Sequence, residues 1–90
     1  MTHAQARCFR RNDEILCKEM DGELCLVDPY RRVFLSINQT GLEIWQLLDG
    51  AHTQNDIVSV LSHMFECRVS DIQRDVVVFI HELEKRELVF

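Results

Sequence analysis

Histidine and cysteine side chains are the first candidates for chemistry in this chain, because both bind metal ions. His63 and Cys67 are four residues apart, a spacing that places both on one face of a helix. A metal site needs three or four ligands, however, and no second pair of this kind accompanies these two residues. The pattern therefore favours a surface histidine beside a small packing thiol, and it predicts no metal site.

The cysteines are even in number but show no close pair with the Cys-x-x-Cys spacing of zinc and redox sites. Free cysteine is usually buried as a small apolar residue, so we expect reduced thiols that mainly serve packing. The four residues concerned are Cys8, Cys17, Cys25 and Cys67.

Catalytic motifs are missing from the sequence. It has no nucleophile elbow, no glycine-rich phosphate loop and no His-Glu-x-x-His. Fifteen acidic residues in a 90-residue chain produce apparent acid and base pairs by chance, and these are better interpreted as solvated surfaces. The sequence thus predicts a protein without catalytic residues and without a bound cofactor.

Size and charge narrow the function further. Ninety residues allow one domain, and 47% hydrophobic residues are enough for a folded core. The net charge of −5 disfavours nucleic acid as a partner. No apolar run is long enough to span a membrane, and the first residues lack the apolar centre of a signal peptide, so we expect a cytoplasmic location.

The first half of the chain predicts three antiparallel strands. Residues 1–12 have little apolar content and carry three arginines, which indicates a flexible basic arm. Residues 14–20 and 23–28 flank Asp21-Gly22, a strong hairpin signal whose two-residue turn pairs Met20 with Glu23 and fixes the register. This register places Cys17 and Cys25 on opposite faces. A turn over residues 28–32 then leads to a third strand, residues 33–37.

The second half predicts three helices. Asn38 is suited to cap a helix over residues 39–48 that places Trp45 in the core. After a short linker at residues 51–52, Thr53 with Asp56 forms a capping box for a helix that ends near residue 65. Ser70 with Gln73 suggests a third helix, to about residue 86, and residues 88–90 a short extended tail. Strands followed by helices predict an α+β domain with a three-stranded antiparallel sheet.

Two apolar features exceed what a small core needs. The third predicted strand is an edge, and an apolar edge is an aggregation hazard unless something covers it. On the last helix, Val77 and Val78 lie off the apolar stripe formed by Val76, Phe79, Ile80 and Leu83. Either this helix is buried on two sides, or the two valines line an apolar groove for a partner.

The stretch from Ser36-Ile37-Asn38 through residues 40–50, together with residues 26–29 upstream, resembles the PqqD-like proteins. These are small peptide chaperones that recognise the leader segment of ribosomally made and modified peptides. The resemblance covers roughly residues 14–90 and implies a winged-helix-like fold, with residues 13–90 as the peptide-binding domain. It also implies that the leader is added as a strand to the third strand, against the third helix, and is presented to a modifying enzyme, often a radical S-adenosylmethionine enzyme. The implied peptide-binding residues are Val33, Phe34, Leu35, Ser36, Ile37, Arg74, Val77, Val78 and His81.

One departure from the family and two alternative functions remain. Arg31-Arg32 stands where many relatives would have a glycine-containing turn. A winged-helix DNA-binding regulator is an alternative, although residues 70–90 hold five acidic and three basic residues, which would repel phosphate. The second alternative function is that of a structural subunit in a larger enzyme. The sequence names neither the precursor peptide nor the partner enzyme, and it leaves the oligomeric state open.

Overall fold

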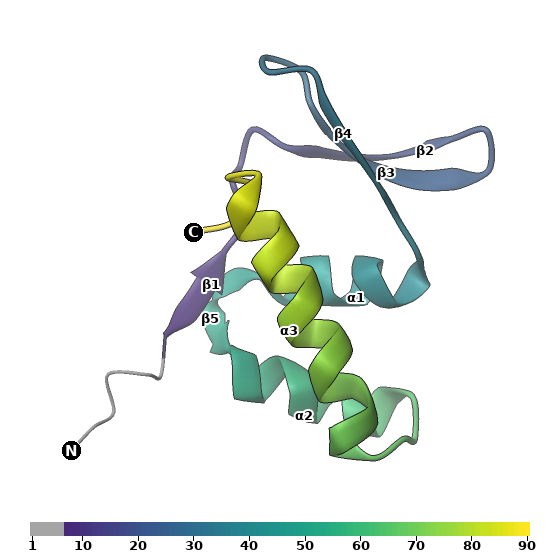
Figure 1. Ribbon diagram of the computed structural model, residues 1–90, viewed down its shortest axis with the longest axis vertical. Coiled ribbons are helices and arrows are strands. Elements are labelled where there is room, and N and C mark those ends of the chain that lie inside the picture. The colour runs from purple at the N-terminus through teal and green to yellow at the C-terminus, as the bar shows by residue number, and fades with distance from the viewer. Residues whose placement is uncertain (1–6) are drawn as a thin grey trace.

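The computed structural model describes residues 7–90 as three helices and two antiparallel sheets (Figure 1). The part of the predicted basic arm that covers residues 1–6 lies outside the described residues. The predicted α+β class is confirmed, with a three-stranded sheet and three helices in the expected order. The elements are β1 (Cys8–Arg10), β2 (Leu16–Met20), β3 (Glu23–Asp28), β4 (Val33–Ile37), α1 (Gln39–Leu47), β5 (Asp49–Thr53), α2 (Gln54–Met64) and α3 (Val69–Lys85).

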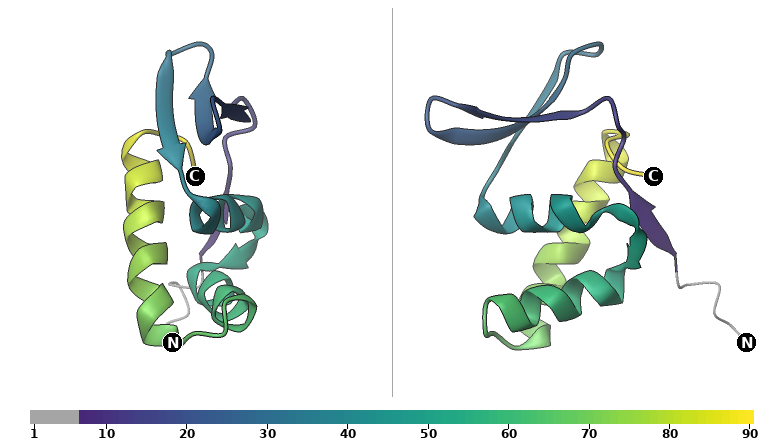
Figure 2. Two further views of the ribbon diagram at one scale, coloured as in Figure 1. Left: turned by 90° about the vertical axis from the view of Figure 1, so that its right-hand side faces the viewer. Right: turned by 180° about the vertical axis from the view of Figure 1, so that it is seen from behind.

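The three-stranded sheet has the order β2-β3-β4 and lies at one end of the molecule, beyond the helices (Figure 2). Its first hairpin has the predicted register, with Met20 opposite Glu23. Asp21 and Gly22 have φ values of 54° and 82°, the positive values that a tight hairpin turn of this kind requires. Cys17 pairs with Leu26 and Cys25 with Lys18, so the two thiols lie on opposite faces. All four cysteines are free as expected, but the packing role is wrong for Cys8 and Cys17, which are exposed.

A tight corner joins β4 to α1. The Asn38 side chain accepts a hydrogen bond from the backbone N–H of Gly41 at 2.8 Å, which confirms the predicted cap. A Cβ atom on Gly41 would lie 3.2 Å from the Cβ of Ile37 and 3.4 Å from a ring carbon of Phe79. Glycine at this position therefore allows the corner to sit directly against α3.

A second, two-stranded sheet was not expected. β1 pairs with β5, and Phe9 of β1 is 7% exposed and belongs to the core. Arg10 and Phe90 exchange two backbone hydrogen bonds, of 3.1 and 2.8 Å, so the predicted extended tail also pairs with this segment. The arm prediction is therefore wrong for residues 8–10, and the predicted linker at residues 51–52 is part of a strand, because backbone groups distant in sequence pair here.

The helices enclose the core. The capping box of Thr53 and Asp56 at the start of α2 is confirmed, as is the burial of Trp45. At α3 the predicted cap is wrong: the helix begins at Val69, and Arg68 occupies the capping position without a side-chain hydrogen bond, so Ser70 is already helical. The largest fully buried side chains are Leu26, Ile44, Leu48, Ile57, Leu61, Val76, Leu83 and Leu88.

Candidate functional site

The outer edge of β4 is open. β4 pairs with β3 on one side, and among residues 7–90 no strand pairs with its other side. Leu35 and Ile37 point inward and pack against the core, whereas Phe34 is 59% exposed. The inward residues hold the strand in place while its free N–H and C=O groups remain available to another extended segment.

A groove of about 660 Å³ lies between the start of α1 and one side of α3. Its apolar wall is formed by Ile44, Val78 and Phe79, which are surrounded by polar side chains. It begins where β4 ends, because Asn38 both follows β4 and lines the groove. The full set of lining residues is Asn38, Thr40, Gly41, Ile44, Arg74, Asp75, Val78, Phe79 and Glu82.

The predicted site residues of α3 fall into two groups. Arg74 and Val78 line the groove. Val77 and His81 are exposed but do not line it. Val77 lies on the other flank of α3, because consecutive helical residues differ by about 100° in direction, and His81 points outward between the two flanks. Val77 and Val78 are 40% and 60% exposed, so α3 is not buried on two sides as one alternative required.

Sequence reasoning missed most of the groove-lining residues. Asp75, Phe79 and Glu82 form one flank of the buried stripe of α3, and Thr40, Gly41 and Ile44 come from α1. The stripe itself identifies two flanks, and only the position of α1 distinguishes the flank that borders the groove. Asn38 was recognised as a cap, but its place at the mouth of the groove follows from the corner that it forms.

The groove carries charges of both signs. The Glu82 carboxylate accepts a hydrogen bond from Nε of Arg86 at 2.9 Å. Arg74 and Asp75 have no ion pair and no side-chain hydrogen bond within the described part of the chain. A segment that enters the groove would therefore meet an apolar wall flanked by one cationic and one anionic side chain, both without a fixed protein partner in residues 7–90.

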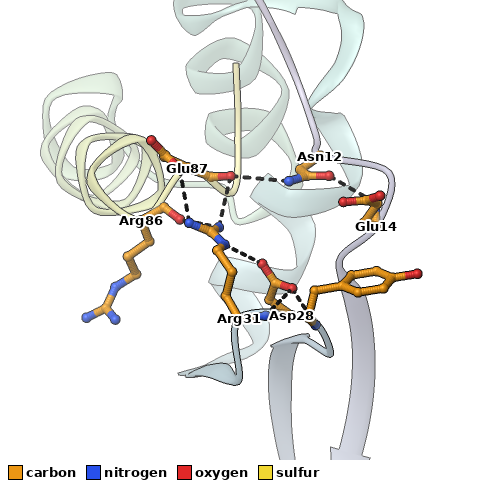
Figure 3. A network of polar contacts seen from close by, with 7 residues as sticks. Asn12, Glu14, Asp28, Arg31, Arg86 and Glu87 are labelled. Carbon is orange, nitrogen blue, oxygen red and sulfur yellow. Dashed lines mark hydrogen bonds and ion pairs between the residues drawn. The ribbon is translucent and has the colours of Figure 1, made fainter.

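A polar network lies at the opposite end of β4 (Figure 3). Asp28, the last residue of β3, is buried and accepts hydrogen bonds from the backbone N–H groups of Tyr30 (2.9 Å) and Arg31 (3.1 Å). It also accepts one from Nε of Arg31 at 2.7 Å. This hydrogen bond from the Arg31 side chain is the main reason why the pKa of Asp28 is lowered below its ordinary value.

Within residues 7–90, no group of three or more His, Cys, Asp or Glu side chains is placed to hold a metal ion. No helix in this part of the chain has the length and apolar character needed to cross a membrane.

Comparison with known proteins identifies the family. The family described as coenzyme PQQ synthesis protein D (PqqD) matches residues 23–89, which is most of the chain. The chain belongs to the PqqD family. No curated protein sequence matches this PqqD-family member significantly.

Solved structures share the fold of this PqqD-family protein. A lasso peptide synthetase B1 complexed with the leader peptide has a TM-score of 0.75 and 24% identity, covering 92% of this chain and 98% of that one. TbiB1 in complex with the TbiA(beta) leader peptide has a TM-score of 0.72 and 21% identity, with 89% and 93% covered. The PqqD truncation of Methylobacterium extorquens PqqCD, described as a functional and stand-alone recognition element, has a TM-score of 0.73 and 15% identity, with 91% and 87% covered.

Proposed function

We propose that this protein is a non-catalytic peptide chaperone that binds the leader segment of a ribosomally made precursor peptide. The observation that carries the proposal is the open edge of β4, which leads directly into the groove beside α3. Membership of the PqqD family supports it. Further support comes from two solved structures with this fold, which are described as complexes with leader peptides.

In this proposal the leader adds as an extended strand along residues 33–37. Its backbone hydrogen bonds to β4 supply affinity, and its alternate side chains supply specificity. An apolar leader side chain at the end of the strand enters the groove and contacts Val78 and Phe79, with Arg74 and Asp75 beside it. The exposed Phe34 lies on the outer face of the sheet and is open to contact from the partner enzyme.

The partner enzyme modifies the peptide that this protein presents. By resemblance to the PqqD family we assign it to the radical S-adenosylmethionine enzymes, acting together with this protein in the cytoplasm. The description of the PqqCD truncation as a stand-alone recognition element supports a role in recognition that needs no chemistry from this chain.

Titration with synthetic peptides tests the proposal. The probes are peptides that tile the N-terminal halves of the short open reading frames beside the gene, measured by isothermal calorimetry. We expect saturable one-to-one binding of one tile and none of its scrambled version. If no tile binds, a structural subunit is the better interpretation, and tight retention of a random DNA duplex at physiological salt would favour the regulator.

Proline substitutions locate the binding edge. Alternate residues of an edge strand direct their N–H groups to opposite neighbours, and proline removes the N–H. Of Ser36→Pro and Leu35→Pro, one should therefore stay folded by circular dichroism and lose the leader, while the other disturbs the pairing with β3. Normal binding by both variants would exclude β4 as the docking edge.

Two neighbouring valines test the groove. Val78→Asp places a charge on the apolar wall and should weaken leader binding, because a buried unpaired carboxylate is costly. Val77→Asp is the matched control, since Val77 is also exposed but lies on the other flank of α3. Equal loss of affinity in both variants would mean that the leader covers both flanks of α3. The peptide-binding residues implied by the family resemblance, which include Val77 and His81, predict this result.

A further inference from the structure

Arg31 links the sheet to the end of α3 (Figure 3). From the turn between β3 and β4, its Nη2 donates to the backbone oxygens of Arg86 (2.7 Å) and Glu87 (3.4 Å). Its Nη1 lies 3.1 Å from the Glu87 carboxylate. A cation at the C-terminal end of a helix, bonded to its last free carbonyl groups, is favourable for both hydrogen bonding and the helix dipole.

These contacts have no counterpart elsewhere. Among residues 7–90, the contacts of Arg31 are the only hydrogen bonds and ion pairs that join residues 16–37 to α3 or to the residues that cap it. The rest of the attachment is by packing: Leu26, Leu35 and Ile37 pack in or against the core to which α3 contributes, and the corner at Gly41 lies against Phe79.

The two attachments determine how β4 lies relative to α3. The beginning of β4 is held near residues 86–87, and its end is held near Phe79. β4 and the last two turns of α3 therefore run in opposite directions, with the open edge between two fixed points. Loss of the attachment at Arg31 would leave the beginning of β4 without a polar link to α3, so that only the pairing with β3 and the packing of its inward side chains would hold it.

We propose that Arg31 is a positioning residue for peptide binding, which holds the open edge of β4 at the distance from α3 that an added strand requires. This inference rests on the proposed function and adds a residue that does not itself contact the peptide. The Asp28 carboxylate at the end of β3 orients the guanidinium group, and the planar guanidinium of arginine bonds three partners at once.

Lysine cannot replace arginine here, because a single ammonium group has no rigid fork of donors. Arg31→Lys keeps the charge and should weaken leader binding in part. Arg31→Gln removes the charge and the fork, and we expect a loss of affinity on the order of tenfold, comparable with losing one hydrogen bond to a charged group. Calorimetry with the tiled precursor peptides, at a temperature where circular dichroism shows every variant folded, measures both losses.

Two control variants separate positioning from general stability. Arg32→Gln removes an equal charge from the next residue, whose side chain makes no hydrogen bond or ion pair within residues 7–90. Asn12→Ala removes a different contact to the same helix end, because its Nδ2 lies 3.4 Å from the Glu87 carbonyl oxygen. We expect wild-type affinity in both controls, although Asn12→Ala should lower the melting temperature.

Amide hydrogen exchange of the unliganded protein gives a readout without the peptide. Arg31→Gln should increase exchange in residues 33–37 relative to α2, and Arg32→Gln should not. Wild-type affinity in Arg31→Gln, or an equal loss in Asn12→Ala, would overturn the inference while leaving the proposed function intact. Failure of the wild-type protein to bind any tile would overturn both. If Arg31→Gln does not fold, Arg31→Lys decides, and unchanged affinity in that variant counts against the inference.

Discussion

Leu61 of α2 is completely buried, whereas every residue of β2 is exposed. The helical half, which consists of α1, α2, α3 and the β1–β5 sheet, contains most of the core. The three-stranded sheet contributes Leu26 to this core and packs against it with Leu35 and Ile37. The helical half therefore carries most of the stability of the fold, whereas β2 and the open edge of β4 contribute little to it.

Substitution of a core residue should show the largest difference between the two regions. Leu61→Ala removes a fully buried side chain and should lower the free energy of unfolding by about 2–5 kcal/mol. Phe34→Ala, on the exposed face of the sheet, should change it by less than about 0.5 kcal/mol. Urea unfolding followed by tryptophan fluorescence measures both values, and comparable losses would contradict the division.

Phe9 tests whether β1 belongs to the helical half. Its side chain is buried in the core, and the guanidinium of Arg7 lies 4.4 Å from its ring centre. Phe9→Ala should therefore cost about 3 kcal/mol, a large loss for a position close to the start of the chain. Cys8→Ser is the matched control because Cys8 is exposed, and its stability should equal that of the wild type. An unchanged free energy of unfolding in Phe9→Ala would show that this segment is a flexible arm, as the sequence predicted.

Acid should weaken the junction between the two regions. Arg31 holds the pKa of Asp28 below its ordinary value, so the native state binds this proton less readily than the unfolded chain. The stabilisation is complete above the pKa of the unfolded chain and is lost as the pH falls through the lower pKa of the folded state. Urea midpoints measured from pH 6 to pH 2 should therefore fall less steeply in Asp28→Asn than in the wild type. Asp21→Asn is the control, because an exposed turn position with positive φ also accepts asparagine.

The helix caps should give the smallest effects. Thr53→Ala removes one half of the capping box of α2 and should cost about 1 kcal/mol. Ser70→Ala should be nearly neutral, because α3 begins before Ser70. Thermal unfolding of the two variants compares them directly. A cost at Ser70 equal to that at Thr53 would place the start of α3 where the sequence pattern predicted it.

Local signals explain what the sequence predicted well. The Asp21-Gly22 turn fixes the hairpin register because a two-residue loop allows only one alignment of its strands. Asn38 and Thr53 were recognised as caps because each is followed at the correct spacing by the groups it bonds. The open edge of β4 followed from the order of three consecutive strands.

Contacts between distant residues explain what the sequence did not predict. β5 is short and polar, and its partner β1 lies about 40 residues earlier, so neither segment shows a strand pattern of its own. Ser70 resembled a cap, but α3 begins one residue before it, at Val69. The flank of α3 that forms the groove depends on where α1 packs, and Arg31 reaches residues more than 50 positions away.

The backbone pairing of Arg10 with Phe90 has a consequence for synthesis on the ribosome. The strands of the three-stranded sheet are neighbours in sequence, so their hairpins close short loops and are free to form as soon as residue 37 has emerged. The Arg10–Phe90 pair closes a loop of nearly the whole described chain, and it waits until residue 90 is free of the exit tunnel. The helical half that carries the stability is therefore completed last, and until then the nascent chain exposes the apolar surface that Leu88 and Val89 later help to cover.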